Sequence, residues 1–346
     1  MSMPIWSRRG FLASAAAGLV TSCLARIGLA ASGDGATGAA SAPAGASTRQ
    51  PGPTTKESPV TDEEVRYQML RPGQIVARRK ACPAVYIPLG ILEWHGRHNA
   101  LGADALQAEG LAILAARKGG GLAFPSLYYG EPRIQGLMEA NNPAREQIAE
   151  AMDLPADNFS LAAAPYGEFE MTRQYNQLLQ YILYEAEQLG FRVGVLVCGH
   201  YPLLSHAKAA AENFNMRERT RRTQDGLLAW ACADYAMLRD AYPFRTGDHA
   251  GGWETSHMMA LHPQTVDLSV LPADKTAKLL GAGGAIPPQD SSVAFGWETM
   301  NKAADAMIAE VRHRLDYRSV YQRAGESMLE GQWREKPKPP TNSFGF

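Results

Sequence analysis

Four side chains that can bind a metal or move a proton fall within a stretch of twelve residues: Glu93, His95, His98 and Asp104. Glu93 and His95 directly follow an apolar run, 84–92, that is typical of a buried strand. Two residues apart on an extended chain, they point to the same side. Carboxylate and imidazole groups together suit Zn²⁺ or Mn²⁺. The alternative interpretation is a polar loop that follows a core strand.

Two further segments carry the same residue types. His200 follows the apolar run 192–198, and His249 and Glu254 lie in the glycine-rich segment 247–254. In an open parallel sheet, functional groups gather at the carboxyl ends of the strands. We therefore expect all three segments to meet in one crevice.

Each of these side chains also has a purely structural interpretation. Asp104 is placed to cap a helix that begins at Ala105, and Glu254 is placed as an acid in the first turn of a helix. His200 is compatible with a hydrogen-bonded core histidine, and His249 with a bond to backbone in its Ala-Gly-Gly turn. The sequence leaves these alternatives open.

The elements that must position these groups alternate between strands and helices. The predicted strands are 84–92, 122–130 and 192–198. The predicted helices are 105–117, 171–189, 203–214, 254–261 and 297–317, with a further helix from 61 to 70 that ends before Pro72. Strand, helix and strand in succession indicate a parallel sheet and an α/β fold. The segment 132–169, with a short helix at 144–152, is predicted to be an insertion near the site.

Composition excludes several classes of partner. The chain has 346 residues and a formal net charge of -1, so we expect no nucleic-acid partner and no electrostatic membrane surface. No apolar stretch is long enough for a membrane span. Of the four cysteines, Cys23 lies in the N-terminal leader. The three that remain predict no disulfide framework.

The N-terminus carries paired arginines before an apolar, Ala-rich segment, in the sequence SRRGFL at 7–12. This pattern is typical of a twin-arginine (Tat) signal peptide and predicts export to the periplasm or the medium. The segment around Cys23 also resembles a lipoprotein processing site, which would give a lipid anchor. The predicted organisation is a signal peptide at 1–30, a flexible linker at 31–59, a folded domain at 60–335 and an extended tail at 336–346.

Three motifs, in this order, resemble those of the creatininase (creatinine amidohydrolase) family. Residues 93–98 with Asp104 resemble E-x-H-G-x-H-x5-D, residues 195–200 resemble a strand that ends in N-G-H, and residues 249–256 resemble H-A-G-x-x-E-T-S. The resemblance covers about residues 84–315. It implies a three-layer α/β/α sandwich with a mostly parallel central sheet, and a homo-oligomer.

The resemblance also implies two divalent metal ions per chain, zinc or manganese. Such a centre would hydrolyse a non-peptide or cyclic amide C–N bond of a small molecule through a metal-bridged hydroxide. Creatininase proper supplies one ligand where this chain has Pro202, so Glu254 is its natural replacement. The implied ligands are Glu93, His95, Asp104, His200 and Glu254, with Asp104 bridging.

Positions beside the ligands receive catalytic or supporting roles. We expect His249, together with Glu254, to take part in catalysis, His249 as a proton shuttle to the leaving nitrogen. Three further residues are expected to line the substrate pocket or to hold the ligands in place: His98, Tyr201 and Trp253.

Two rival functions remain at this stage. One is a deformylase or a peptidase of small peptides, because the insertion at 132–169 could shape such a pocket. The other is a non-catalytic binding protein that keeps the fold. Pro202 and Cys198, which depart from the family pattern, favour that second rival.

Overall fold

The computed structural model describes residues 64–130, 144–159, 166–221 and 226–322, which all belong to one compact unit, Glu57–Phe346. The predicted signal peptide, linker and tail, together with Cys23, lie outside the described residues. Their assignments therefore stay predictions.

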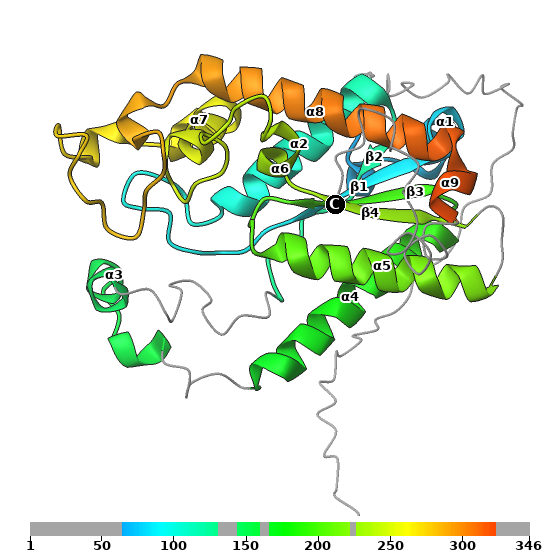
Figure 1. The fold of residues 1–346 in the computed structure, drawn as a ribbon, viewed down its shortest axis with the longest axis horizontal. Coiled ribbons are helices and arrows are strands. Elements are labelled where there is room, and N and C mark those ends of the chain that lie inside the picture. Colours follow the sequence, from blue (N-terminus) through cyan, green and yellow to red (C-terminus); the bar gives the residue numbers. More distant parts are fainter. Residues whose placement is uncertain (1–63, 131–143, 160–165, 222–225, 323–346) are drawn as a thin grey trace, which may run out of the picture. The chain divides into compact units, whose positions relative to one another are not determined.

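A four-stranded parallel sheet forms the centre of the described unit (Figure 1). Its strands stand in the order β2-β1-β3-β4, and β1 pairs with β3 along its whole length. Every residue of β1 and β3 is buried, on both faces of the sheet. Both strands are therefore unbroken apolar runs in the sequence. The strands are β1 (Ala84–Leu89), β2 (Leu122–Ala123), β3 (Val193–Cys198) and β4 (Leu228–Cys232).

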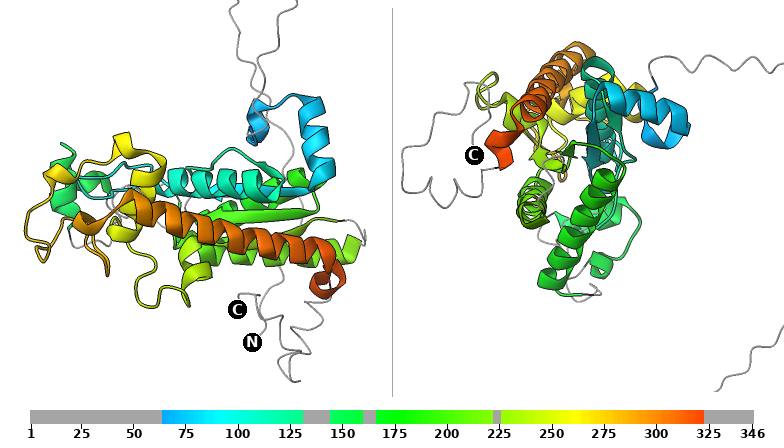
Figure 2. Two further views of the ribbon diagram at one scale, coloured as in Figure 1. Left: turned by 90° about the horizontal axis from the view of Figure 1, so that it is seen from above. Right: turned by 90° about the vertical axis from the view of Figure 1, so that its right-hand side faces the viewer.

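Helices cover both faces of this sheet (Figures 1 and 2). One face carries α2 (Ala103–Gly119), α7 (Gly252–Leu261) and α8 (Val293–Asp316). The other face carries α4 (Glu168–Gln188) and α5 (Leu203–Arg221). The three-layer α/β/α sandwich predicted from the family resemblance is thus confirmed.

Alternation along the strands divides the core into two clusters. Tyr86 and Val195 join the cluster under α8, whereas their neighbours Ile87 and Leu196 join the cluster under α4. Helix α4 buries a single stripe at helical spacing, and its members are Tyr175, Leu179, Leu183 and Ala186.

The predicted helix over 61–70 is wrong in the part that the structure describes. Only the short 3₁₀ turn η1 (Tyr67–Met69) forms there, and α1 (Pro72–Ala81) begins at the proline that was expected to follow a helix. Proline lacks an N–H and has a fixed φ, so it fits the first turn of a helix, where the N–H has no intrahelical partner.

The predicted insertion at 132–169 contains α3 and η3, and its residues 132–143 and 160–165 lie outside the described residues. No helix among the described ranges is both long and apolar enough to cross a bilayer.

The other short elements are α3 (Arg145–Ala151), η3 (Ala156–Phe159), α6 (Asp234–Leu238), η5 (Pro263–Thr265), η6 (Leu268–Val270), η7 (Pro288–Asp290) and α9 (Arg318–Gln322).

Two glycines bring the ends of β1 and β3 close to the first turn of α2. A Cβ atom on Gly199 would lie 1.8 Å from the carbonyl oxygen of Asp104, and one on Gly90 would lie 2.2 Å from the amide nitrogen of Ala105. No larger residue fits at either position without moving the helix. This close approach sets the position of Asp104 relative to both strands.

Candidate metal centre

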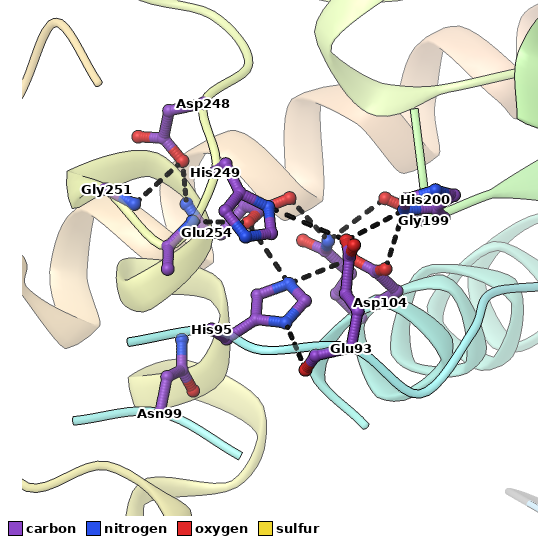
Figure 3. Close-up of polar contacts among 12 residues, drawn as sticks. Glu93, His95, Asn99, Asp104, Gly199, His200, Asp248, His249, Gly251 and Glu254 are labelled. Atoms are coloured by element: carbon purple, nitrogen blue, oxygen red, sulfur yellow. Dashed lines mark hydrogen bonds and ion pairs between the residues drawn. The ribbon is translucent and has the colours of Figure 1, made fainter. Parts of the chain in front are cut away.

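Five of the predicted ligands converge beyond the carboxyl ends of β1 and β3 (Figure 3). They are Glu93, His95, Asp104, His200 and Glu254, and none is more than 3% exposed. Burying that many ionisable groups together is costly unless each finds an opposite charge or a metal.

Each ligand position follows from the local structure. Glu93 and His95 lie in the loop after β1, and His200 lies two residues after the end of β3. Asp104 and Glu254 lie in the first turns of α2 and α7, where the helix dipole favours a carboxylate. Asp104 does not cap its helix, because α2 has no side-chain cap bond at its N-terminus.

The carboxylate of Asp104 lies between two histidines. The Nδ1 atom of His200 is 2.9 Å from Asp104 Oδ2 and 2.9 Å from Glu93 Oε1. The Nε2 atom of His95 is 3.1 Å from Asp104 Oδ1 and 3.5 Å from Glu254 Oε2. Asp104 therefore contributes one oxygen to each of two groups of ligand atoms, and the atoms of each group lie within 4.8 Å of one another.

The orientation of His95 fits a metal ligand. Its Nδ1 is 3.1 Å from the backbone oxygen of Glu93. A carbonyl only accepts, so Nδ1 must carry the hydrogen, and in a neutral ring Nε2 then directs a lone pair at two carboxylates. A cation between these atoms removes the repulsion, and metal-binding histidines commonly donate their other N–H to a carbonyl in this way.

The electrostatics of the centre also require positive charge. Burial, with the neighbouring Asp104, raises the pKa of Glu93. Burial alone would lower the pKa of His200, but Asp104 and Glu93 raise it to about 10, and Asp104 likewise raises the pKa of His95 well above its usual range. The cluster therefore binds protons tightly, and metal ions compete with protons for the same lone pairs.

One buried oxygen has no hydrogen bond to satisfy it. Glu93 Oε2 lacks any hydrogen-bond partner among the described residues. Within these residues, no lysine or arginine forms an ion pair with Glu93, Asp104 or Glu254. These residues could therefore hold a divalent cation, with carboxylate and imidazole donors that suit zinc or manganese.

His249 differs from the ligands because its side chain is 36% exposed. Its Nε2 lies 2.7 Å from the backbone oxygen of Trp94, which must be the acceptor, so Nδ1 is the basic atom. Nδ1 is 3.5 Å from Glu93 Oε1, and the ring stands 4.7 Å from that of His95. A half-buried imidazole with a basic nitrogen directed at the predicted ligands can exchange protons with a substrate.

The remaining predicted residues lie around the centre in different ways. His98 is buried, with Nε2 3.0 Å from the backbone oxygen of Ala250 and 3.2 Å from Thr255 Oγ1. Trp253 is fully buried and donates its indole N–H to Asp234 Oδ2 over 2.6 Å. Because Trp253 belongs to α7 and Asp234 to α6, this bond connects the two helices.

Tyr201 follows His200, and its hydroxyl has no hydrogen-bond partner among the described residues. Burial raises the pKa of this phenol well above its usual range, and the carboxylates of Asp234, Glu254, Asp248 and Asp104 raise it further. Tyr201 therefore keeps its proton and can donate it in a hydrogen bond.

Sequence reasoning missed three polar residues that support the centre. Asp248 accepts hydrogen bonds from the backbone nitrogens of Gly251, Trp253 and Glu254, and thereby holds the start of α7. The other two, Gln107 and His257, are buried and bonded to each other. The available signal was the spacing of Gln107, which lies three residues after Asp104 on an otherwise apolar helical face.

Comparisons with known proteins agree with this description. The sequence profile of the family described as Creatininase, creatinine amidohydrolase, matches residues 69–139 and 170–314. The creatinine amidohydrolase of Pseudomonas putida is 29% identical over 195 residues, which make up 53% of this chain and 65% of that enzyme. The alignment thus spans slightly less than two thirds of the enzyme.

Solved structures share the fold at lower identity. A structure described as creatininase Mn is 20% identical with a TM-score of 0.53, covering 72% of this chain and 98% of that chain. A mutant creatininase of the Zn-Zn type is 22% identical with a TM-score of 0.52, at the same coverage of 72% and 98%.

Proposed function

Because the chain belongs to the creatininase family, we propose that it is a metal-dependent hydrolase that cleaves a non-peptide or cyclic amide C–N bond in a small molecule. One observation carries this proposal: Asp104 places one carboxylate oxygen in each of two ligand groups. A shared carboxylate is the arrangement that a two-metal hydrolytic centre needs.

The two groups assign the ligands to two ions. Glu93, Asp104 and His200 would hold one, and His95, Asp104 and Glu254 would hold the other. Glu254 thus takes the place of the ligand that Pro202 cannot supply. When bound, two divalent ions supply an activated water molecule and polarise the amide carbonyl. The relatives of the Mn and Zn-Zn types support either metal.

We assign His249 as the residue that supplies a proton to the leaving nitrogen. Amide hydrolysis adds water to the carbonyl carbon and breaks the C–N bond, and the nitrogen must gain a proton to leave. The bond from Nε2–H to Trp94 fixes the ring, so that Nδ1 faces the centre. The buried hydroxyl of Tyr201, which has no hydrogen-bond partner among the described residues, is assigned to donate to the substrate.

The test measures metal content and hydrolysis on the full chain. After purification without chelators, elemental mass spectrometry should find two divalent ions per chain. A panel of cyclic amides, formamides and short peptides should give its highest kcat/KM with a cyclic amide. His249→Asn should keep both ions and lose most of the hydrolysis, because an amide cannot carry the proton.

Three outcomes would contradict the proposal. Fewer than one ion per chain, with no uptake from added Zn²⁺ or Mn²⁺, would favour a non-catalytic binding protein. A preference for formamides or peptides would favour the deformylase or peptidase alternative. Loss of an ion in His249→Asn would make His249 a ligand, as its grouping with Glu93 and His95 permits.

The cellular location is a separate proposal that the N-terminal sequence supports. Residues 1–30 would direct export by the twin-arginine route, followed by release or by lipid attachment at Cys23, and the folded domain would work as a homo-oligomer. Fusing residues 1–35 to a reporter tests export. Replacing both Arg8 and Arg9 with lysine should keep that reporter in the cytoplasm.

A further inference from the structure

A line of buried polar side chains runs behind Glu254 and joins three helices. Gln107 comes from α2, His257 from α7 and Thr299 from α8. Their exposed fractions are 4%, 0% and 0%, although each carries at least one polar atom. Buried polar groups in such a position need a complete set of hydrogen-bond partners.

The hydrogen bonds of Gln107 fix the orientation of its amide and the tautomer of His257. Gln107 Nε2 lies 3.2 Å from the backbone oxygen of Gly199 and 3.2 Å from Glu254 Oε1, and both partners only accept. The amide oxygen of Gln107 must therefore accept from His257 Nδ1–H, which is 3.2 Å away. His257 Nε2 then lies 2.9 Å from the hydroxyl of Thr299, and the backbone oxygen of Phe295 lies 2.8 Å from the same hydroxyl, so these two acceptors share its one hydrogen.

The protonation of His257 agrees with this tautomer. Burial lowers the pKa of His257 to about 3, so the ring is neutral near pH 7 and has one N–H to give. Asp234 Oδ2 lies farther from Nδ1, at 3.6 Å, and accepts the indole N–H of Trp253 over 2.6 Å. The N–H of His257 is thus directed at Gln107.

We infer that Gln107 is a positioning residue that holds Glu254 as a metal ligand, and that His257 and Thr299 hold Gln107 in turn. With Oε1 bonded to Gln107, the other oxygen, Oε2, faces His95 at 3.5 Å and accepts from the amide of Ala250 over 2.8 Å. This inference rests on the proposed function, since it concerns the ligand that replaces the one missing at Pro202.

The surroundings explain why Glu254 needs this support. A glutamate side chain has three rotatable bonds, so a ligand that reaches the centre from a different helix must be fixed by contacts. The small cavity beside Gln107 is also lined by Ala108, Leu111 and Met300. In the part of the chain that the structure describes, Gln107 donates the hydrogen bond that Oε1 of Glu254 accepts.

The test compares the affinities of the two ions in Gln107→Leu and in the wild-type full chain. Zn²⁺ is titrated against a chromophoric chelator, and the stoichiometry is checked by elemental mass spectrometry. Supporting residues of this kind typically change metal affinity about 10–100-fold. We expect that loss for the ion that Glu254 binds, and a change of less than about threefold for the ion held by Glu93, Asp104 and His200.

Two controls separate positioning from general stability. Met300→Leu, beside the same cavity, removes no hydrogen bond and should leave both affinities unchanged. Thr299→Val should weaken the same ion as Gln107→Leu, whereas Thr299→Ser keeps the hydroxyl and should restore wild-type affinity. A merely structural role would lower the thermal midpoint without distinguishing between the two ions.

The outcomes distinguish this inference from the proposed function. Equal affinities in Gln107→Leu and the wild type would overturn the positioning role and leave the two-metal centre intact. An equal weakening of both ions would also overturn it. A wild-type chain that binds fewer than two ions would overturn the proposed centre itself, and with it the role of Gln107.

Discussion

Replacing Gly199 with alanine should move the predicted metal ligands His200 and Asp104 apart. Gly199 makes no side-chain contact, but its Cα lies against the first turn of α2, and an added Cβ would stand 1.8 Å from the carbonyl oxygen of Asp104. A second contact, 3.1 Å from Ala108 Cβ, blocks the neighbouring direction. The clash involves backbone, so no rotamer change can relieve it.

The size of the displacement follows from these distances. Ordinary contact needs about 3.4 Å or more, so the end of β3 and the start of α2 must separate by roughly 1.5 Å. His200 Nδ1 and Asp104 Oδ2, now 2.9 Å apart, would then stand more than about 4 Å apart, too far for two ligands of one ion with bonds of about 2.1 Å. Overpacking of this kind costs about 1–3 kcal/mol.

The assay combines metal content with thermal unfolding. Gly199→Ala should hold less than about half of the wild-type metal and should unfold about 3–10 °C lower, at about 2–4 °C for each kcal/mol. Gly73→Ala is the matched control, because nothing lies within 4 Å of its added Cβ. Full metal content, with a midpoint equal to that of the wild type, would show that the close approach of Gly199 to α2 does not position His200 and Asp104.

Three other perturbations give distinct expected results. Glu254→Gln should lose one of two ions and most of the amide hydrolysis while keeping the ion on Glu93, Asp104 and His200; two ions in the variant would contradict the assignment. Stripping the metal with a chelator should lower the thermal midpoint, and Zn²⁺ at about 100 times its Kd should restore about 2.7 kcal/mol; an unchanged midpoint would argue against a structural contribution from the ions. His257 has a pKa lowered from 6.5 to about 3 by burial, so the unfolded chain takes up its proton first and stability falls as pH drops from 6.5 towards 3. His257→Gln should reduce the dependence of the free energy of unfolding on pH by up to about 1.4 kcal/mol per pH unit. The measurement is urea unfolding of the metal-free protein at several pH values. The same pH dependence in the variant and the wild type would exclude a buried neutral ring at His257.

The sequence predicts the sheet, and the convergence of the candidate ligands, for identifiable reasons. Strands β1 and β3 are buried on both faces, so hydrophobicity marks them without ambiguity. The ligands lie within a few residues of strand ends or helix starts, where spacing alone shows that they share a side. Pro72 shows the limit of local rules, since proline suits both the end of one segment and the first turn of the next helix.

The supporting residues could not be predicted in the same way. Gln107 is separated from its partner Glu254 by 147 positions, and His257 from Thr299 by 42. The place of Gln107 on an otherwise apolar helical face is a local signal of burial, but it does not show which groups its three hydrogen bonds reach. Asp248 acts on backbone amides three to six residues ahead of it, outside the usual capping spacing.

The ligand set also has a consequence for how the molecule is built. Glu93, His200 and Glu254 lie on three stretches of chain that meet only after β1 has paired with β3 and α7 has docked on α2. Under the proposed function, a nascent or unravelled chain would offer scattered, weak ligands, and tight metal binding would occur only after these segments have come together. Once captured, each ion ties together segments that must all separate before the chain can open, so a loaded molecule would resist proteases far longer than an empty one.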